Sequence, residues 1–84
     1  MKNGYLTFRS VTYAQRGEAL LRRSGFDIVL QRTPKWMEEQ GCGYCLRLPV
    51  GELGAAARLL RVNAVSFRRA YLRREDGMLE EWKL

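Results

Sequence analysis

Histidine is absent from this 84-residue sequence, and its absence excludes several kinds of chemistry. Histidine is the commonest general base near neutral pH and the commonest metal ligand. Hydrolases that activate a serine or a cysteine with histidine are therefore excluded. A tetrahedral zinc site needs four ligands, and the chain offers only two cysteines, Cys42 and Cys45. We expect no cofactor, and no metal site unless two chains share it.

Long hydrophobic runs are also missing. The N-terminal residues have no apolar stretch of signal-peptide length, and no segment reaches the roughly 20 apolar residues of a membrane-spanning helix. Cys42 and Cys45 are three positions apart, a spacing that makes a structural disulfide an unfavourable arrangement in a reducing compartment. We therefore expect a cytoplasmic protein without membrane contact.

The composition is that of a folded domain: 46% of residues are hydrophobic and 29% are charged. This length accommodates one core, so we expect a single domain over residues 1–84, with its core over about 4–74. Fifteen Lys and Arg against nine Asp and Glu give a net charge of +6. That charge favours an acidic protein or a nucleic acid as partner, although scattered arginines also simply keep a small domain soluble.

Apolar periodicity predicts four strands and two helices. In chain order they are a strand over 5–9, a helix over 11–23, a strand over 26–31, a strand over 44–48, a helix over 51–62 and a strand over 65–74. Ser10 is the expected N-cap of the first helix, and Ser24-Gly25 its end. The order indicates an α+β, ferredoxin-like βαββαβ fold, an antiparallel sheet with both helices on one face. Right-handed crossovers place the first and third strands in the centre of this sheet and the second and fourth at its edges.

The C-terminal segment predicts an extra hairpin strand over about 78–84. Asp76-Gly77 is a strong signal for a two-residue turn. Such a turn would set Arg73 opposite Glu80 and Tyr71 opposite Trp82. The new strand would pair with the fourth strand and extend the sheet at that edge. A frayed charged terminus is the alternative.

Cys42 is the candidate reactive residue. The connection between the second and third strands should end near the start of the first helix, close to Ser10 and Thr12. A helix N-terminus and basic neighbours such as Arg9 and Lys35 lower the pKa of a thiol. The alternative is that Gly41-Cys42-Gly43 is a flexible strand entry whose cysteine only fills space.

Strand alternation also makes predictions for the third strand. Cys45 and Arg47 should point away from the helices while Leu46 and Leu48 enter the core. On an open sheet face, Cys45 should be partly accessible. The alternative for Cys45 is a packing role, because it sits within a strand. The lone CxxC sequence that it forms with Cys42 is a weak signal for redox chemistry.

The residues resemble one family. Four segments carry the resemblance: Tyr5-Leu6-Thr7-Phe8, a helix with Ala14, Glu18 and Leu21, then Arg32-Thr33-Pro34-Lys35, and Cys42-Gly43 followed by Arg47. Together they are similar to the selenium/sulfur carrier-like family of small bacterial proteins. The resemblance implies that Cys42 holds sulfane sulfur or selenium. It implies a cysteine desulfurase as donor and an acceptor such as selenophosphate synthetase.

Some residues depart from the family pattern. Gln40-Gly41 stand where small hydroxyl residues are expected, and Cys45 stands where a small apolar residue is expected. Cys45 could act as a resolving thiol that converts a persulfide into a disulfide. The residues expected to assist Cys42 by binding are Gly43, Ser10, Thr12, Arg9, Lys35 and Arg47.

Two hypotheses of different classes follow. The first is a non-enzymatic carrier that receives and passes on a chalcogen through Cys42. The second is a basic interaction module that binds a protein or a nucleic acid through the open face of its sheet, with incidental cysteines. Thiol reactivity distinguishes them, since an activated thiolate reacts with iodoacetamide faster than an ordinary thiol.

Overall fold

The computed structural model describes residues 3–33, 43–73 and 79–82. Cys42, Lys35 and the predicted turn at Asp76-Gly77 lie outside these residues. The elements are β1 (Asn3–Thr7), α1 (Val11–Arg23), β2 (Val29–Arg32), β3 (Tyr44–Pro49), a short 3-10 turn (Val50–Glu52), α2 (Leu53–Val62), β4 (Arg69–Arg73) and β5 (Leu79–Trp82).

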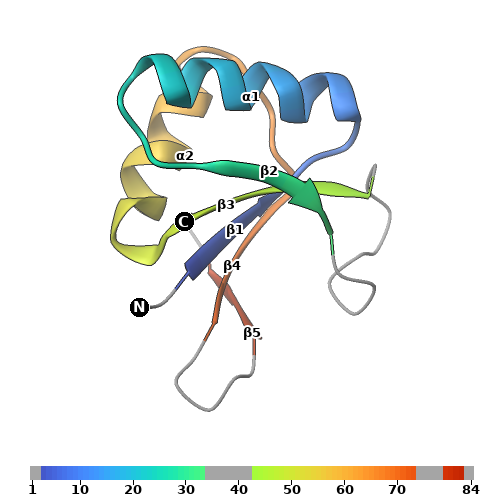
Figure 1. Cartoon of the computed structure of the whole chain (residues 1–84), viewed down its shortest axis with the longest axis vertical. Helices are drawn as coiled ribbons and strands as arrows, with labels where there is room; N and C mark the ends of the chain where they lie inside the picture. The colour runs from blue at the N-terminus through green and yellow to red at the C-terminus, as the bar shows by residue number, and fades with distance from the viewer. Residues whose placement is uncertain (1–2, 34–42, 74–78, 83–84) are drawn as a thin grey trace.

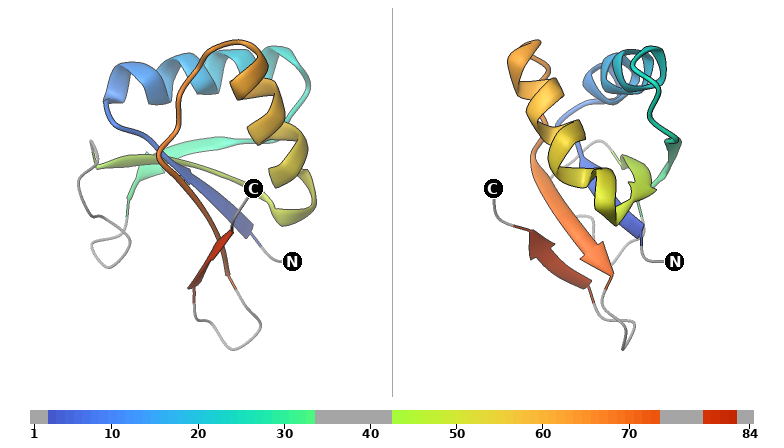
Figure 2. Two further views of the ribbon diagram at one scale, coloured as in Figure 1. Left: turned by 180° about the vertical axis from the view of Figure 1, so that it is seen from behind. Right: turned by 90° about the vertical axis from the view of Figure 1, so that its left-hand side faces the viewer.

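The five strands form one antiparallel sheet in the order β2-β3-β1-β4-β5. Both helices lie on the same side of it (Figures 1 and 2). The predicted α+β, ferredoxin-like architecture is therefore confirmed, and so is the predicted strand order with its extra edge strand. Strands β2 and β4 are shorter than expected, because residues 26–28 and 65–68 cross from the helix layer before sheet pairing begins.

Helix α1 begins and ends where the sequence predicts. The Ser10 hydroxyl accepts a hydrogen bond from the Tyr13 N–H at 3.3 Å, so it satisfies one of the free donors of the first turn. At the other end, Gly25 has φ +91°. The N–H groups of Gly25 and Phe26 donate to the carbonyls of Arg22 and Leu21. This is a Schellman motif, which requires a left-handed residue at the Gly25 position.

Helix α2 ends in the same motif with a different residue. The Ala64 N–H donates to the Arg61 carbonyl, and the Val65 N–H donates to the Leu60 carbonyl. Ala64 occupies the position equivalent to Gly25, with φ +59°. A side chain in this conformation is strained by about 1–2 kcal/mol, because Cβ approaches the carbonyl oxygen.

We expect Ala64→Gly to stabilise the protein. Relief of the strain at Ala64 exceeds the added backbone entropy of glycine in the unfolded chain, so the free energy of unfolding should rise by about 0.5–1 kcal/mol. Urea denaturation followed by circular dichroism measures the change. The matched control is Gly25→Ala, which should lower the free energy of unfolding. A loss of stability in Ala64→Gly would contradict this account of the cap.

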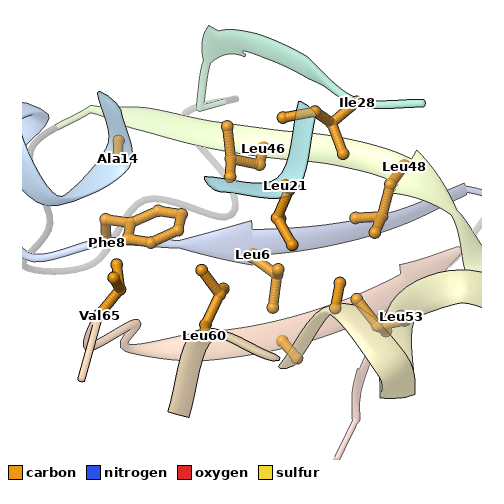
Figure 3. Close-up of a cluster of buried hydrophobic side chains, with 12 residues drawn as sticks. Leu6, Phe8, Ala14, Leu21, Ile28, Leu46, Leu48, Leu53, Leu60 and Val65 are labelled. Carbon is orange, nitrogen blue, oxygen red and sulfur yellow. The ribbon is translucent and has the colours of Figure 1, made fainter. Parts of the chain in front are cut away.

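The core lies between the helices and the sheet face that carries Leu6, Leu46 and Ala70 (Figure 3). Leu46 and Leu48 enter it, as strand alternation predicts. Phe8, directly after β1, is fully buried there. The buried members are Leu6, Phe8, Ala14, Leu21, Ile28, Leu46, Leu48, Leu53, Ala56, Leu60, Val65 and Ala70.

The predicted register of β5 is wrong by one residue. Trp82 pairs with Ala70, and Tyr71 pairs with Glu81. A shift of one residue moves every side chain to the other face of the sheet. Trp82 therefore packs against the core, and its ring lies close to Gly54 of α2, where an added Cβ would be 3.3 Å from the ring. Burial of this large ring favours the observed register over an exposed aromatic pair.

Candidate functional site

Thr33 and Gly43 flank the segment that contains Cys42, and a hydrogen bond joins them. The Thr33 N–H donates a hydrogen bond of 2.8 Å to the Gly43 carbonyl. Thr33 and Gly43 are both buried. This bond lies directly beyond the last β2–β3 pair, Arg32 with Tyr44. The described structure thus holds the two ends of residues 34–42 together at one end of the sheet.

Gly43, the residue bonded to Cys42, has a backbone conformation that favours glycine. Its φ is +83°, in the left-handed region. Space among the described residues is not the reason, because there an added Cβ would meet only the Arg32 Nη1, at an ordinary contact distance of 3.8 Å. Glycine at this position therefore serves the turn of the chain between Cys42 and β3.

Several elements meet at this end of the sheet. Thr7, the last residue of β1, pairs with Cys45 on one side and Arg69 on the other. The start of β3, the start of β4 and the start of α1 consequently share this end (Figure 1). The expectation that the β2–β3 connection leaves the sheet beside α1 is confirmed for its flanks. The predicted closeness of Cys42 itself to Ser10 or Thr12 lies outside the described residues.

The predicted residues at the start of α1 have different environments. Ser10 is half-buried, and its hydroxyl is engaged in the helix cap. Thr12 is exposed in the first turn, and Arg9 is exposed just before the helix. The first turn of α1 contains no acidic residue. The positive end of the helix dipole is thus not compensated from within the helix.

Arg47 lies farther from this end than the other predicted residues. It pairs with Tyr5 and Val29 in the middle of the sheet, two positions along β3 from Cys45. It is half-buried on the face opposite the helices. The fold thus brings Arg9, Ser10, Thr12 and Gly43 to one sheet end and leaves Arg47 outside that group.

Cys45 faces away from the helices, as predicted, but the prediction that it is partly accessible is wrong. Its exposed fraction is 0%. Cys45 forms a second cluster with buried Tyr5, and half-buried Tyr71 packs against this pair. Aromatic side chains on neighbouring strands are long enough to cover a small diagonal neighbour. Sequence reasoning missed this role of the two tyrosines, although alternation places them on the same face as Cys45.

We expect Cys45 to react slowly with thiol reagents in the folded protein. In a Cys42→Ser variant, Cys45 is the remaining thiol, and the reagent must await an opening of the tyrosine-covered cluster. Labelling by 5,5′-dithiobis(2-nitrobenzoate) should then be at least about 100-fold slower in buffer than in denaturant. Equal rates in the two solvents would contradict the burial of Cys45.

Neither a metal site nor a membrane-spanning helix is found among the described residues. Within residues 3–33, 43–73 and 79–82, no group of three or more potential ligands is arranged to hold a metal ion. In the same part of the chain, no helix is both long enough and apolar enough to cross a bilayer.

Comparison with known proteins gives one match. Searches of curated proteins and of solved structures found no similar protein. The sequence model of the family described as "Putative Se/S carrier protein-like" matches residues 3–72. This range runs from the first residue of β1 into β4 and includes Cys42, Gly43 and Cys45. The chain therefore belongs to the Se/S carrier protein-like family.

Proposed function

We propose that this protein is a chalcogen carrier that holds sulfane sulfur or selenium on Cys42 and does not itself catalyse a reaction. Membership of the Se/S carrier-like family supports the class of function. The burial of Cys45 is the observation that favours Cys42 as the carrier residue. Of the two cysteines in the chain, Cys45 is fully buried beside Tyr5, and a buried thiol is not a ready nucleophile. Cys42 is the other.

The transfer step is a thiol exchange without net oxidation. The Cys42 thiolate attacks the outer sulfur of a donor persulfide, forms a new S–S bond and displaces the donor cysteine as a thiolate. The proton of the donor persulfide stays on the transferred sulfur. Delivery to an acceptor nucleophile reverses these roles, and Cys42 is the leaving group. The same scheme applies to selenium.

The charges at this end of the sheet favour such a thiolate. Arg9 and Arg32 are both exposed there, and basic side chains lower the pKa of a neighbouring thiol. Lys35, in the same connection as Cys42, is proposed to add to this effect. Exposed Thr12 and the cap residue Ser10 are proposed to line the approach of a partner, with Gly43 setting the turn of the chain next to Cys42 and Arg47 contributing charge.

The proposed donor is a cysteine desulfurase, and the proposed acceptor is selenophosphate synthetase or an enzyme of similar chemistry. We propose that both meet the protein in the cytoplasm. A resolving role for Cys45 requires that its buried cluster with Tyr5 first opens, because the exposed fraction of Cys45 is 0%. Transfer to another protein is therefore favoured over internal disulfide formation in the folded state.

The direct test is the intact mass of the protein after incubation with a cysteine desulfurase and cysteine. We expect a gain of about 32 Da, the mass of one sulfur atom, reversed by dithiothreitol. An iodoacetamide titration of the same preparation establishes that a free thiol was present before loading. Protein with a titratable thiol that shows no added mass would refute sulfur carriage from such a donor.

A further inference from the structure

Arginines gather beside the connection between α2 and β4. Two adjoining cavities of about 290 and 330 Å³ open there. They share three lining residues, Ser66, Phe67 and Arg68. We call the combined surface the arginine groove, and its charged and aromatic lining residues are Arg9, Arg61, Phe67, Arg68, Arg69 and Glu81.

The backbone of the groove is fixed to the end of β1. The Arg68 N–H donates to the Thr7 carbonyl at 2.7 Å. The Thr7 hydroxyl accepts from the Arg69 N–H at 3.1 Å and lies 3.3 Å from the Arg69 carbonyl, to which it donates. Val65 is buried in the core just before the groove residues. The arginines thus extend from a rigid base, which reduces the entropy lost when a ligand binds.

The charges of the groove are only partly neutralised. Arg69 forms an ion pair of 3.0 Å with Glu81 of β5. The Arg61 guanidinium lies over the Phe67 ring, 5.5 Å from its centre. Within the described part of the chain, the side chains of Arg9 and Arg68 have no carboxylate partner. The groove therefore presents two uncompensated guanidinium groups, which are suited to binding oxyanions in pairs.

The surroundings favour carboxylates of a protein over the phosphates of a nucleic acid. Single-stranded RNA is bound on ferredoxin-like sheets by stacking on exposed aromatic rings. Here Tyr5, in the centre of the open face, is only 5% exposed. Glu81 also lines the groove, but its carboxylate is paired with Arg69, so the charges of Arg9 and Arg68 remain for a ligand. Arginine combined with an aromatic ring is typical of protein interfaces.

We propose that the arginine groove binds a carboxylate-rich segment of a partner protein. Arg9 and Arg68 hold the carboxylates, and Phe67 with its covering Arg61 provides the contact surface beside them. The groove lies at the sheet end where β3 begins, directly after Gly43, so a bound segment would sit at the end from which the Cys42 connection extends. The proposal does not depend on sulfur carriage, because the groove could bind such a segment even if Cys42 were inert.

The test uses two fluorescent probes, an octaglutamate peptide and an oligothymidylate of the same charge. Their affinities are measured by anisotropy with the full chain at about 50 mM salt, where screening is moderate. The test variant is Arg9→Ala/Arg68→Ala. The matched control is Arg23→Ala/Arg58→Ala, which removes two exposed arginines outside the groove and leaves the same net charge.

We expect Arg9→Ala/Arg68→Ala to weaken peptide binding about tenfold or more, because two charge-assisted contacts are lost. The control pair should weaken it less than about twofold. Equal losses of peptide affinity in the two variants would show that only net charge matters, and would overturn the proposal that the groove is the binding site. Tighter binding of the oligothymidylate, lost in Arg9→Ala/Arg68→Ala, would assign the groove to nucleic acid instead. Absence of peptide binding would also overturn the proposal.

Discussion

Serine in place of Cys42 is expected to abolish sulfur loading by a cysteine desulfurase. A hydroxyl is a far weaker nucleophile than a thiolate at neutral pH and forms no persulfide, so the added mass of about 32 Da should disappear entirely. The fold should persist, because the core cluster consists of residues from the described helices, strands and their connections. Circular dichroism and the urea midpoint of the variant verify that the loss is chemical.

Cys45→Ala is the matched control for this experiment. It removes the buried thiol and retains Cys42, so loading should remain close to that of the parent. Its cost is a small cavity beside Tyr5 and Tyr71, which should lower the free energy of unfolding by about 1 kcal/mol. Loading of Cys42→Ser equal to the parent would end the assignment of the chalcogen to Cys42. Loading lost only in Cys45→Ala would transfer the assignment to Cys45.

Local signals in the sequence were enough to predict the architecture. Ser10 and Gly25 mark the ends of α1 because each satisfies a backbone requirement that few other residues meet. The strand order followed from the alternation of helices and strands and from the handedness of crossovers. The end of α2 has no such glycine in the sequence, since Ala64 adopts the left-handed conformation that glycine usually occupies at this position.

Two errors arose where distant packing decides the outcome. Asp76-Gly77 predicted a two-residue turn, but the register of β5 follows the burial of Trp82 beside Gly54. Alternation placed Cys45 on the open face correctly, but there it is buried in a cluster with Tyr5 of β1, against which Tyr71 of β4 packs. Neither contact is local in the sequence. The arginine groove was missed for the same reason, because Arg9 and Arg68 meet only through the pairing of β1 with β4.

The largest expected effect on stability is that of Phe8→Ala. Phe8 is fully buried, and among the residues that the structure describes it is the largest fully buried side chain. Figure 3 shows its ring in the core between Ala14 and Val65. Removal of a buried phenylalanine ring leaves a cavity and costs about 3–5 kcal/mol. That is a large part of the roughly 5–15 kcal/mol that stabilises a typical domain, so the urea midpoint should fall sharply.

Gly17 makes this prediction specific to the packing of the ring. A Cβ at Gly17 would lie 3.1 Å from Phe8 Cζ and 3.3 Å from Leu46 Cδ1, closer than ordinary contact. In the parent protein, this crowding should offset the roughly 1 kcal/mol that alanine gains over glycine within a helix. In Phe8→Ala the ring is gone, and the new methyl group enters the cavity. Gly17→Ala should therefore raise the free energy of unfolding of the Phe8→Ala variant by about 1 kcal/mol.

The two substitutions together form a double-mutant cycle, measured by urea denaturation of four proteins. Coupling should be favourable and about 1 kcal/mol, because Gly17→Ala helps only when the Phe8 ring is absent. If Phe8→Ala is too unstable to measure alone, Phe8→Leu supplies a milder background in which Gly17→Ala should also raise the free energy of unfolding relative to its effect in the parent. Equal effects of Gly17→Ala in both backgrounds would mean that the ring and the helix backbone are not in the close contact that holds α1, and with it Ser10 and Thr12, against the sheet.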